Sequence, residues 1–270
     1  MRLLIEHEAT FRFEPAARFV NGLIRLSPRN HEGQYVAKWR IALDADGRLK
    51  PNDDGFGNAV HGMALTGPLD GVTLRVEGEV STFDTTGVLH GTIERFPAEF
   101  FLRGSPLTEA PSELHAYSKA AAGAGDDPLG RLHGLLAAIH RDFSWQKELS
   151  PEPPPSAAAV FAAGAGDAAG LAHVFIAGTH RLALPARFAC GYCLTTEGTP
   201  GRGLHAWAEA HVPGLGWIAF DPALGYCPSE THVRVACGLD AVSTAPFRLA
   251  GSSQAQIMRS DLIQISQIFA

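Results

Sequence analysis

The segment 204–221 constrains the fold of this 270-residue chain more strongly than any other stretch. Its first half alternates, with alanine or valine at every second position, which is the period of a β-strand with two distinct faces. The tight connection Pro213-Gly-Leu-Gly216 and the apolar run behind it indicate a partner strand, so the whole segment predicts a β-hairpin. In such a hairpin, His205 and Asp221 lie on neighbouring strands at the end away from the turn.

The rest of the chain divides into a β-rich part and a mixed part. Residues 1–90 hold several short alternating segments separated by turn residues, which is typical of a β-sandwich. Beyond them, apolar residues recur at helical spacing after Asp127-Pro128, an N-cap followed by a proline at the first helical position. An alanine-rich helix capped by a serine is expected over 156–164, and another helix over about 167–181.

A histidine held by an aspartate supplies two of the three groups that a thiol-dependent attack on an amide needs. The histidine acts as base and then as acid, and the third group fixes the orientation of its ring. The nucleophile itself is best placed at a helix N-terminus, where free N–H groups and the helix dipole favour a thiolate. The glycine-rich segment 164–170 looks like the start of such a helix.

Several blocks of the chain resemble the bacterial transglutaminase-like proteins. The resemblance is most specific in the block His205-Ala-Trp-Ala-Glu209 through Phe220-Asp221-Pro222, and it extends over 164–176, 183–192 and 232–241, with softer matches at 23–29 and 54–58. It implies an α+β protein, with an N-terminal β-sandwich domain over 1–95 and a papain-like core over 96–270. In that core a nucleophile helix would pack on an antiparallel sheet.

The resemblance also implies a triad of residue 168, His205 and Asp221 that acts on amide, peptide or isopeptide bonds. Position 168 should then be a cysteine, but it is Ala168, which cannot form a thioester. We therefore expect the chain as written to be catalytically inactive. It is either an active-site mutant, with the cysteine changed deliberately, or a natural pseudoenzyme that serves as a peptide-binding or scaffold module. The codon at this position in the source gene distinguishes the two.

Other residues are candidates for support around this triad. The backbone N–H groups at Ala168 and Ala169 and the indole N–H of Trp145 could stabilise an oxyanion. Trp207 shares the face of the catalytic histidine and is expected to support it, while His232 could line the substrate site. For His173, inside the helix, and for Arg234 and Asp240 a structural role is favoured, with packing or a buried hydrogen bond expected for His173.

The cysteines suggest no metal or redox site. Cys190 and Cys193 form a CxxC pair, but in a predicted strand rather than at a helix start, and Cys227 and Cys237 lack the spacing of a second ligand pair. His205 and His211, six residues apart on a strand, would be about 20 Å from each other. No metal or other cofactor is expected.

Charge and hydropathy narrow the partners. The net charge of −6 and the lack of a Lys/Arg run exclude a basic nucleic-acid site, and no apolar stretch approaches a membrane span. The first residues read as a strand rather than a signal peptide, which predicts a cytoplasmic protein. The expected partner is a peptide or protein substrate, and either water or an amine could accept its acyl group; the sequence predicts no oligomeric state.

Overall fold

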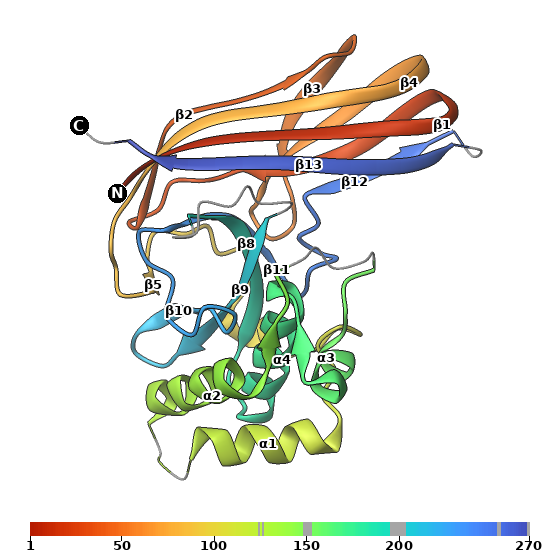
Figure 1. Cartoon of the computed structure of the whole chain (residues 1–270). Coiled ribbons are helices and arrows are strands. Elements are labelled where there is room, and N and C mark those ends of the chain that lie inside the picture. Colours follow the sequence, from red (N-terminus) through yellow and green to blue (C-terminus); the bar gives the residue numbers. More distant parts are fainter. Residues whose placement is uncertain (124, 126, 148–152, 195–203, 253–254, 269–270) are drawn as a thin grey trace.

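A computed structural model describes residues 1–123, 125, 127–147, 153–194, 204–252 and 255–268. A large β-sheet forms one side of the molecule, and a smaller sheet with four α-helices forms the other (Figure 1). The α+β class predicted from the sequence is confirmed. No helix within these ranges is both long enough and apolar enough to span a bilayer.

Two unusually long antiparallel strands, β1 (Arg2–Ser27) and β4 (Ala59–Thr82), run through the whole large sheet. At one end they are flanked by β2 (Gln34–Leu43) on β4 and by β13 (Gln256–Gln267) on β1. At the other end they are flanked by β3 (Gly47–Asp53) and β12 (Phe247–Gly251). The sheet order is therefore β12-β1-β4-β2, with β13 on β1 and β3 on β4.

The sandwich predicted for this region is one sheet whose two halves fold over a shared core. The register of β1 against β4 shifts between Arg12 and Ala17 and again before Phe19, beside Pro15, which has no N–H to donate to a ladder. Across the core, Phe11 of one half packs against Phe247 of the other, with ring centroids 5.0 Å apart. The many short strands expected from the sequence are thus segments of two long, bent strands.

The end of the chain returns to the large sheet. Strands β12 and β13 pair with β1, so that Leu3 lies opposite Gln267 and both termini emerge at the same end of the sheet (Figure 1). The sequence-based division into 1–95 and 96–270 assigned these last strands to the core. In space they complete the N-terminal sheet.

The helices begin where the sequence predicts caps. In α2 (Pro128–Asp142) the Asp127 side chain accepts hydrogen bonds from two backbone N–H groups of the first turn. In α3 (Ala157–Ala163) the Ser156 hydroxyl does the same for one, and Gly164 ends the helix at φ 65°, a left-handed conformation that favours glycine. A 3-10 turn, η1 (Ala98–Leu102), and α1 (Ser112–Ala122) complete the connection from the large sheet.

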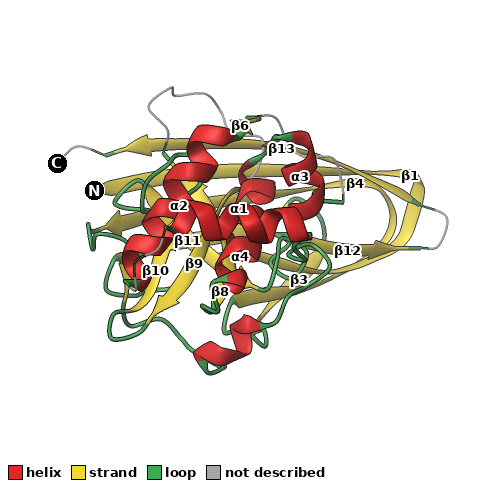
Figure 2. Ribbon diagram, turned by 90° about the horizontal axis from the view of Figure 1, so that it is seen from below, coloured by secondary structure: helices red, strands yellow, loops and turns green. Residues whose placement is uncertain are grey.

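The core sheet has the strand order β11-β8-β9-β10-β5. Its strands are β8 (Ala186–Cys193), β9 (His205–Val212), β10 (Gly216–Phe220), β11 (His232–Gly238) and the short β5 (Val88–Leu89). Helix α4 (Ala168–Arg181) packs on one face through a single apolar cluster that includes Phe175, Ala208 and Phe220. The other helices surround α4 on the side away from the large sheet (Figure 2).

Amide side chains of the N-terminal region cap the free edge of the core sheet. The Gln34 amide donates to the Arg234 carbonyl and accepts from the Arg234 N–H, at 3.0 and 2.7 Å. Asn58 makes the same pair of bonds with Cys237, both at 2.8 Å. Because these bonds replace the ladder that an edge strand lacks, they hold β11 in place beneath the large sheet.

Candidate active site

The predicted hairpin is present, and its open end carries a buried acid with two histidines. Strands β9 and β10 pair antiparallel, and Asp221 follows directly after β10. Nε2 of His205 lies 2.5 Å from Oδ2 of Asp221, and Nε2 of His232 lies 3.1 Å from the same oxygen. The structure thus brings His205 and Asp221 together as the sequence predicts, and it adds His232 to the pair.

The environment keeps Asp221 ionised. Its side chain is fully buried, and its second oxygen accepts the N–H of Leu224 at 3.0 Å. Burial alone would raise the pKa of this carboxyl, but the charges and hydrogen bonds of His205 and His232 hold the pKa well below its ordinary value. A carboxylate so placed fixes the ring of His205, the more exposed histidine of the two, with 11% of its side chain exposed.

Two tryptophans flank His205. Trp207, buried in β9, stacks against His205 with ring centroids 6.3 Å apart and meets His232 edge to face at 5.3 Å. Trp145 approaches His205 from another direction, edge to face at 6.2 Å. Both tryptophans, each a candidate from the sequence, lie next to this histidine, and the support role of Trp207 stays a prediction.

Trp145 also lies close to the start of α4 in the chain pairing. Strand β6 (Ser144–Trp145) pairs in parallel with β7 (Ala165–Gly166), so Trp145 lies opposite Gly166, two residues before Ala168. Ala168 is the first residue of α4 and is partly buried. Trp145 therefore connects the helix start to His205.

The N-terminus of α4 presents backbone N–H groups that the helix itself does not use. The Asp167 side chain caps the helix by accepting the N–H of Gly170 at 2.8 Å. Among the residues that the structure describes, the N–H groups of Ala168 and Ala169 have no hydrogen-bond partner. Such free donors at the positive end of a helix dipole can stabilise an oxyanion. Ala168 offers only a methyl group, so this end of the site has no nucleophile.

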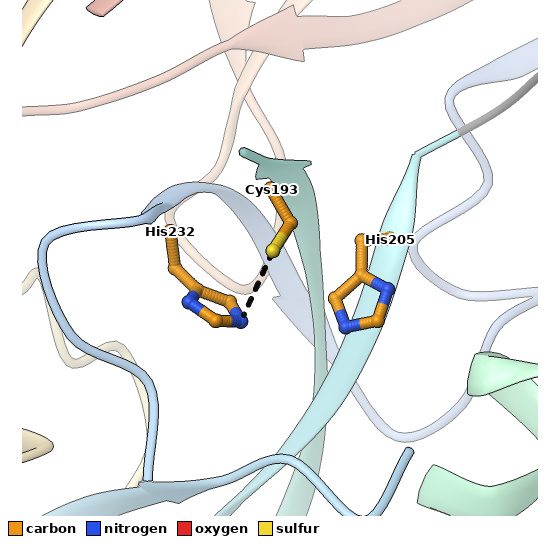
Figure 3. Close-up of side chains that lie close together, drawn as sticks. All are labelled: Cys193, His205 and His232. Atoms are coloured by element: carbon orange, nitrogen blue, oxygen red, sulfur yellow. Dashed lines mark hydrogen bonds between the residues drawn. The ribbon is translucent and has the colours of Figure 1, made fainter. Parts of the chain in front are cut away.

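Sequence reasoning missed Cys193, which lies beside the two histidines (Figure 3). Its Sγ is 3.6 Å from Nε2 of His232, and the register explains why: His232 pairs with Cys193, and Gly191, two residues earlier, pairs with His205. Strand alternation places Cys193 on the same face as Gly191. Pairing β8 with both the hairpin and β11 would therefore have revealed these contacts.

Cys193 is not prepared to act as a nucleophile. Burial, together with the negative charge of Asp221, raises the pKa of its thiol to about 12. It ends a strand rather than beginning a helix, so it lacks the dipole that favours a thiolate. The other CxxC member, Cys190, is buried and its pKa is likewise raised to about 12, chiefly by burial.

The remaining candidates have structural partners. His173 is buried, with Nδ1 2.9 Å from the Pro155 carbonyl and Nε2 accepting the Ala241 N–H at 3.1 Å, so the predicted buried hydrogen bond is confirmed. Asp240 accepts the Ser243 N–H at 2.7 Å within a turn.

A small pocket lies between the core sheet and the N-terminal region. Trp207, His232 and Arg234 line its core side. Its lining includes neither Ala168 nor His205, so this pocket is not the space between those two residues.

Family models match two regions of the chain. The bacterial transglutaminase-like N-terminal region matches residues 3–81, and the transglutaminase-like superfamily core matches 115–222. Together the two regions span well over half of the sequence. Comparison with curated proteins found no match.

Solved structures share the fold. A candidate cysteine protease from Cytophaga hutchinsonii superposes with a TM-score of 0.76 at 16% identity, covering 98% of both chains. The periplasmic domain of TgpA from Pseudomonas aeruginosa, bound to ethylmercury, gives a TM-score of 0.39 at 16% identity, over 81% of this chain and 90% of that one. With both regions matched and one fold shared end to end, this chain belongs to the bacterial transglutaminase-like family.

Proposed function

We propose that this chain is a transglutaminase-like protein that receives an amide-bearing peptide or protein segment between α4 and the hairpin, without turning it over. The observation that carries the proposal is the bond of His205 to Asp221, at 2.5 Å, beside a helix start with free N–H groups. These features support a thiol-dependent amide site that lacks only the thiol. The proposal is the same whether Ala168 is natural or introduced.

The orientation of His205 supports this role. Because Nε2 bonds to Asp221, Nδ1 is the nitrogen left to exchange a proton with a nucleophile or leaving group. Figure 3 shows this second nitrogen on the side of the ring turned away from Cys193 and His232. Trp145, which lies opposite Gly166, borders the histidine ring as well.

A cysteine at position 168 would complete a balanced reaction. Its thiol gives its proton to His205 as the sulfur adds to the amide carbon, and the backbone N–H groups of Ala169 and of residue 168 hold the oxyanion. The C–N bond then breaks as His205 passes that proton to the leaving amine. Water or a second amine next attacks the thioester carbon, His205 takes the proton of the attacking group, and the C–S bond breaks as that proton returns to the sulfur. Water gives hydrolysis and an amine gives crosslinking. With a methyl group at Ala168, no C–S bond can form.

The test is to restore the thiol with Ala168→Cys and to follow alkylation or acylation of each cysteine by peptide mapping. We expect the introduced thiol to react at least about 100-fold faster than Cys193 or Cys227, since burial raises the pKa of both, to about 12 and about 11. Adding His205→Ala should remove most of that advantage, because the imidazole no longer takes the thiol proton.

The matched control is Ala169→Cys, which places a thiol on the same helix turn but points it about 100° away. If the thiol at position 168 reacts no faster than the one at 169, the proposed nucleophile position is wrong. If His205→Ala leaves the rate at 168 unchanged, the pairing of helix and hairpin is wrong. Supplying an acyl peptide with and without a primary amine then separates hydrolysis from crosslinking.

A further inference from the structure

One group of three metal-binding side chains converges in the described part of the chain. The ligand atoms of Cys193, His205 and His232 all lie within 4.8 Å of one another (Figure 3). They come from the end of β8, the start of β9 and the start of β11, three adjacent strands of one antiparallel sheet. Because the strands alternate in direction, these three positions meet at the same end of the sheet.

We propose that Cys193, His205 and His232 bind a zinc ion. One thiolate and two imidazoles are ligands that Zn²⁺ prefers, and three protein ligands leave a position for water or another group. In a tetrahedral site, zinc–ligand bonds of about 2.0–2.3 Å place the ligand atoms about 3.3–3.8 Å apart. The 3.6 Å between Cys193 Sγ and His232 Nε2 already has this value.

Asp221 supplies the electrostatic reason for a cation here. Nε2 of His205 and Nε2 of His232 both lie against the same oxygen, Oδ2, at 2.5 and 3.1 Å. The partly positive Nε2–H groups of both histidines thus point at one buried carboxylate. A cation bound between the two rings can replace these two hydrogens. The carboxylate of Asp221 and the thiolate of Cys193 together balance the two charges of the ion, as burial requires.

The second-layer contacts of the ligands are also suited to a metal. His232 binds the Thr231 hydroxyl through Nδ1 at 3.0 Å, which fixes its ring and leaves Nε2 for the ion. The side chain of His232 is 3% exposed and that of His205 is 11% exposed, so the group is sheltered yet reachable from the His205 side. Cys193 is partly buried.

This zinc site does not depend on the proposed function, since Ala168 contributes no ligand. The two do share His205: an ion bound to Nε2 displaces the Asp221 bond that orients the ring. Zinc should therefore slow labelling of the Ala168→Cys variant, whereas binding of zinc to the unaltered chain is measured without any reaction.

The experiment uses the full chain, stripped with a chelator and titrated with Co²⁺ and then with Zn²⁺. We expect one equivalent of Co²⁺ to give a thiolate-to-metal charge-transfer band with strong tetrahedral d–d bands, and Zn²⁺ to displace it. Cys193→Ser should remove the charge-transfer band and weaken zinc binding by at least about 10- to 100-fold. His232→Gln should weaken binding by a similar factor.

Cys227→Ser is the matched control, because Cys227 is also partly buried but lies outside the group. It should keep the band and the affinity. Unfolding curves of each apo variant show whether it is folded. At the same zinc concentration, the rise in Tm should be larger for the unaltered chain and Cys227→Ser than for the two ligand variants. The proposal is overturned if the unaltered chain gives no thiolate band, or if Cys193→Ser retains it.

Discussion

Two buried carboxylates of the core sheet, Glu209 and Asp221, bond to different kinds of side chain. Glu209, in the middle of β9, bonds to the guanidinium of Arg187 at 2.6 Å and to that of Arg234 at 2.5 and 3.0 Å. Asp221, at the end of β10, bonds to two imidazoles. Both carboxylates are fully buried. Their surroundings therefore differ in the chemistry of the cation rather than in burial.

This difference separates a cluster that only holds strands together from one whose side chains can change protonation state or partner. A guanidinium stays protonated, so the Glu209 cluster has one state and ties β8, β9 and β11 together. An imidazole can lose its proton, turn or bind a metal, so the Asp221 cluster has several states. The Glu209 cluster therefore holds the centre of the sheet in one arrangement, whereas the Asp221 cluster at its end can change its protonation or its ligands. Two substitutions and one change of pH would break or sharpen this distinction.

The largest effect is expected for Glu209→Gln. It leaves the largely buried side chain of Arg234 without its ion-pair partner, and Arg187 with Glu94 alone, so the free energy of unfolding should fall by about 3–5 kcal/mol. Urea unfolding followed by circular dichroism measures it. The control Glu94→Gln, at a side chain that is 33% exposed, should cost about 1 kcal/mol or less. Equal losses for the two variants would contradict the central role of Glu209.

Acid should weaken the same cluster. Burial opposes ionisation of Glu209, but Arg234 and Arg187 prevail and lower its pKa to about 2. A carboxyl with a lowered folded pKa stabilises the protein above its unfolded pKa, about 4.3, and that contribution is lost as the pH falls toward 2. The gap in unfolding free energy between the unaltered chain and Glu209→Gln should thus shrink by about 2 kcal/mol from pH 6 to pH 3. An unchanged gap would exclude the ion-pair origin of its stability.

Local patterns predicted the hairpin and the helix starts because short-range physics decides them. The alternation over β9, the Pro213–Gly216 turn and the caps Asp127 and Ser156 are each readable from a few neighbouring residues, and each is present. The bond of His205 to Asp221 followed from the hairpin alone.

Features that depend on distant pairing were missed. Cys193 and His232 are 39 residues apart and meet only because β11 pairs with β8, a partnership that no local pattern specifies. Likewise β13 adds to β1 across almost the whole chain, and the apolar periods of β1 do not show that it bends through two halves of one sheet. The role of residue 168 as a nucleophile position rests on the family resemblance and stays a prediction.

Of the two buried carboxylates, Asp221 is expected to show the smaller loss of stability, on change to Asn. An amide keeps the size of the side chain and can still accept the Leu224 N–H, and the two imidazoles left beside it can be neutral, so no buried charge is left without a partner. Unfolding free energy should fall by only about 1 kcal/mol. In the Ala168→Cys background, however, thiol labelling should slow by about 100-fold, because the ring of His205 loses its anionic partner. If Asp221→Asn instead unfolds the protein as readily as Glu209→Gln does, while labelling is unaffected, then the two carboxylates have the same structural role and the end of the sheet holds no chemical site.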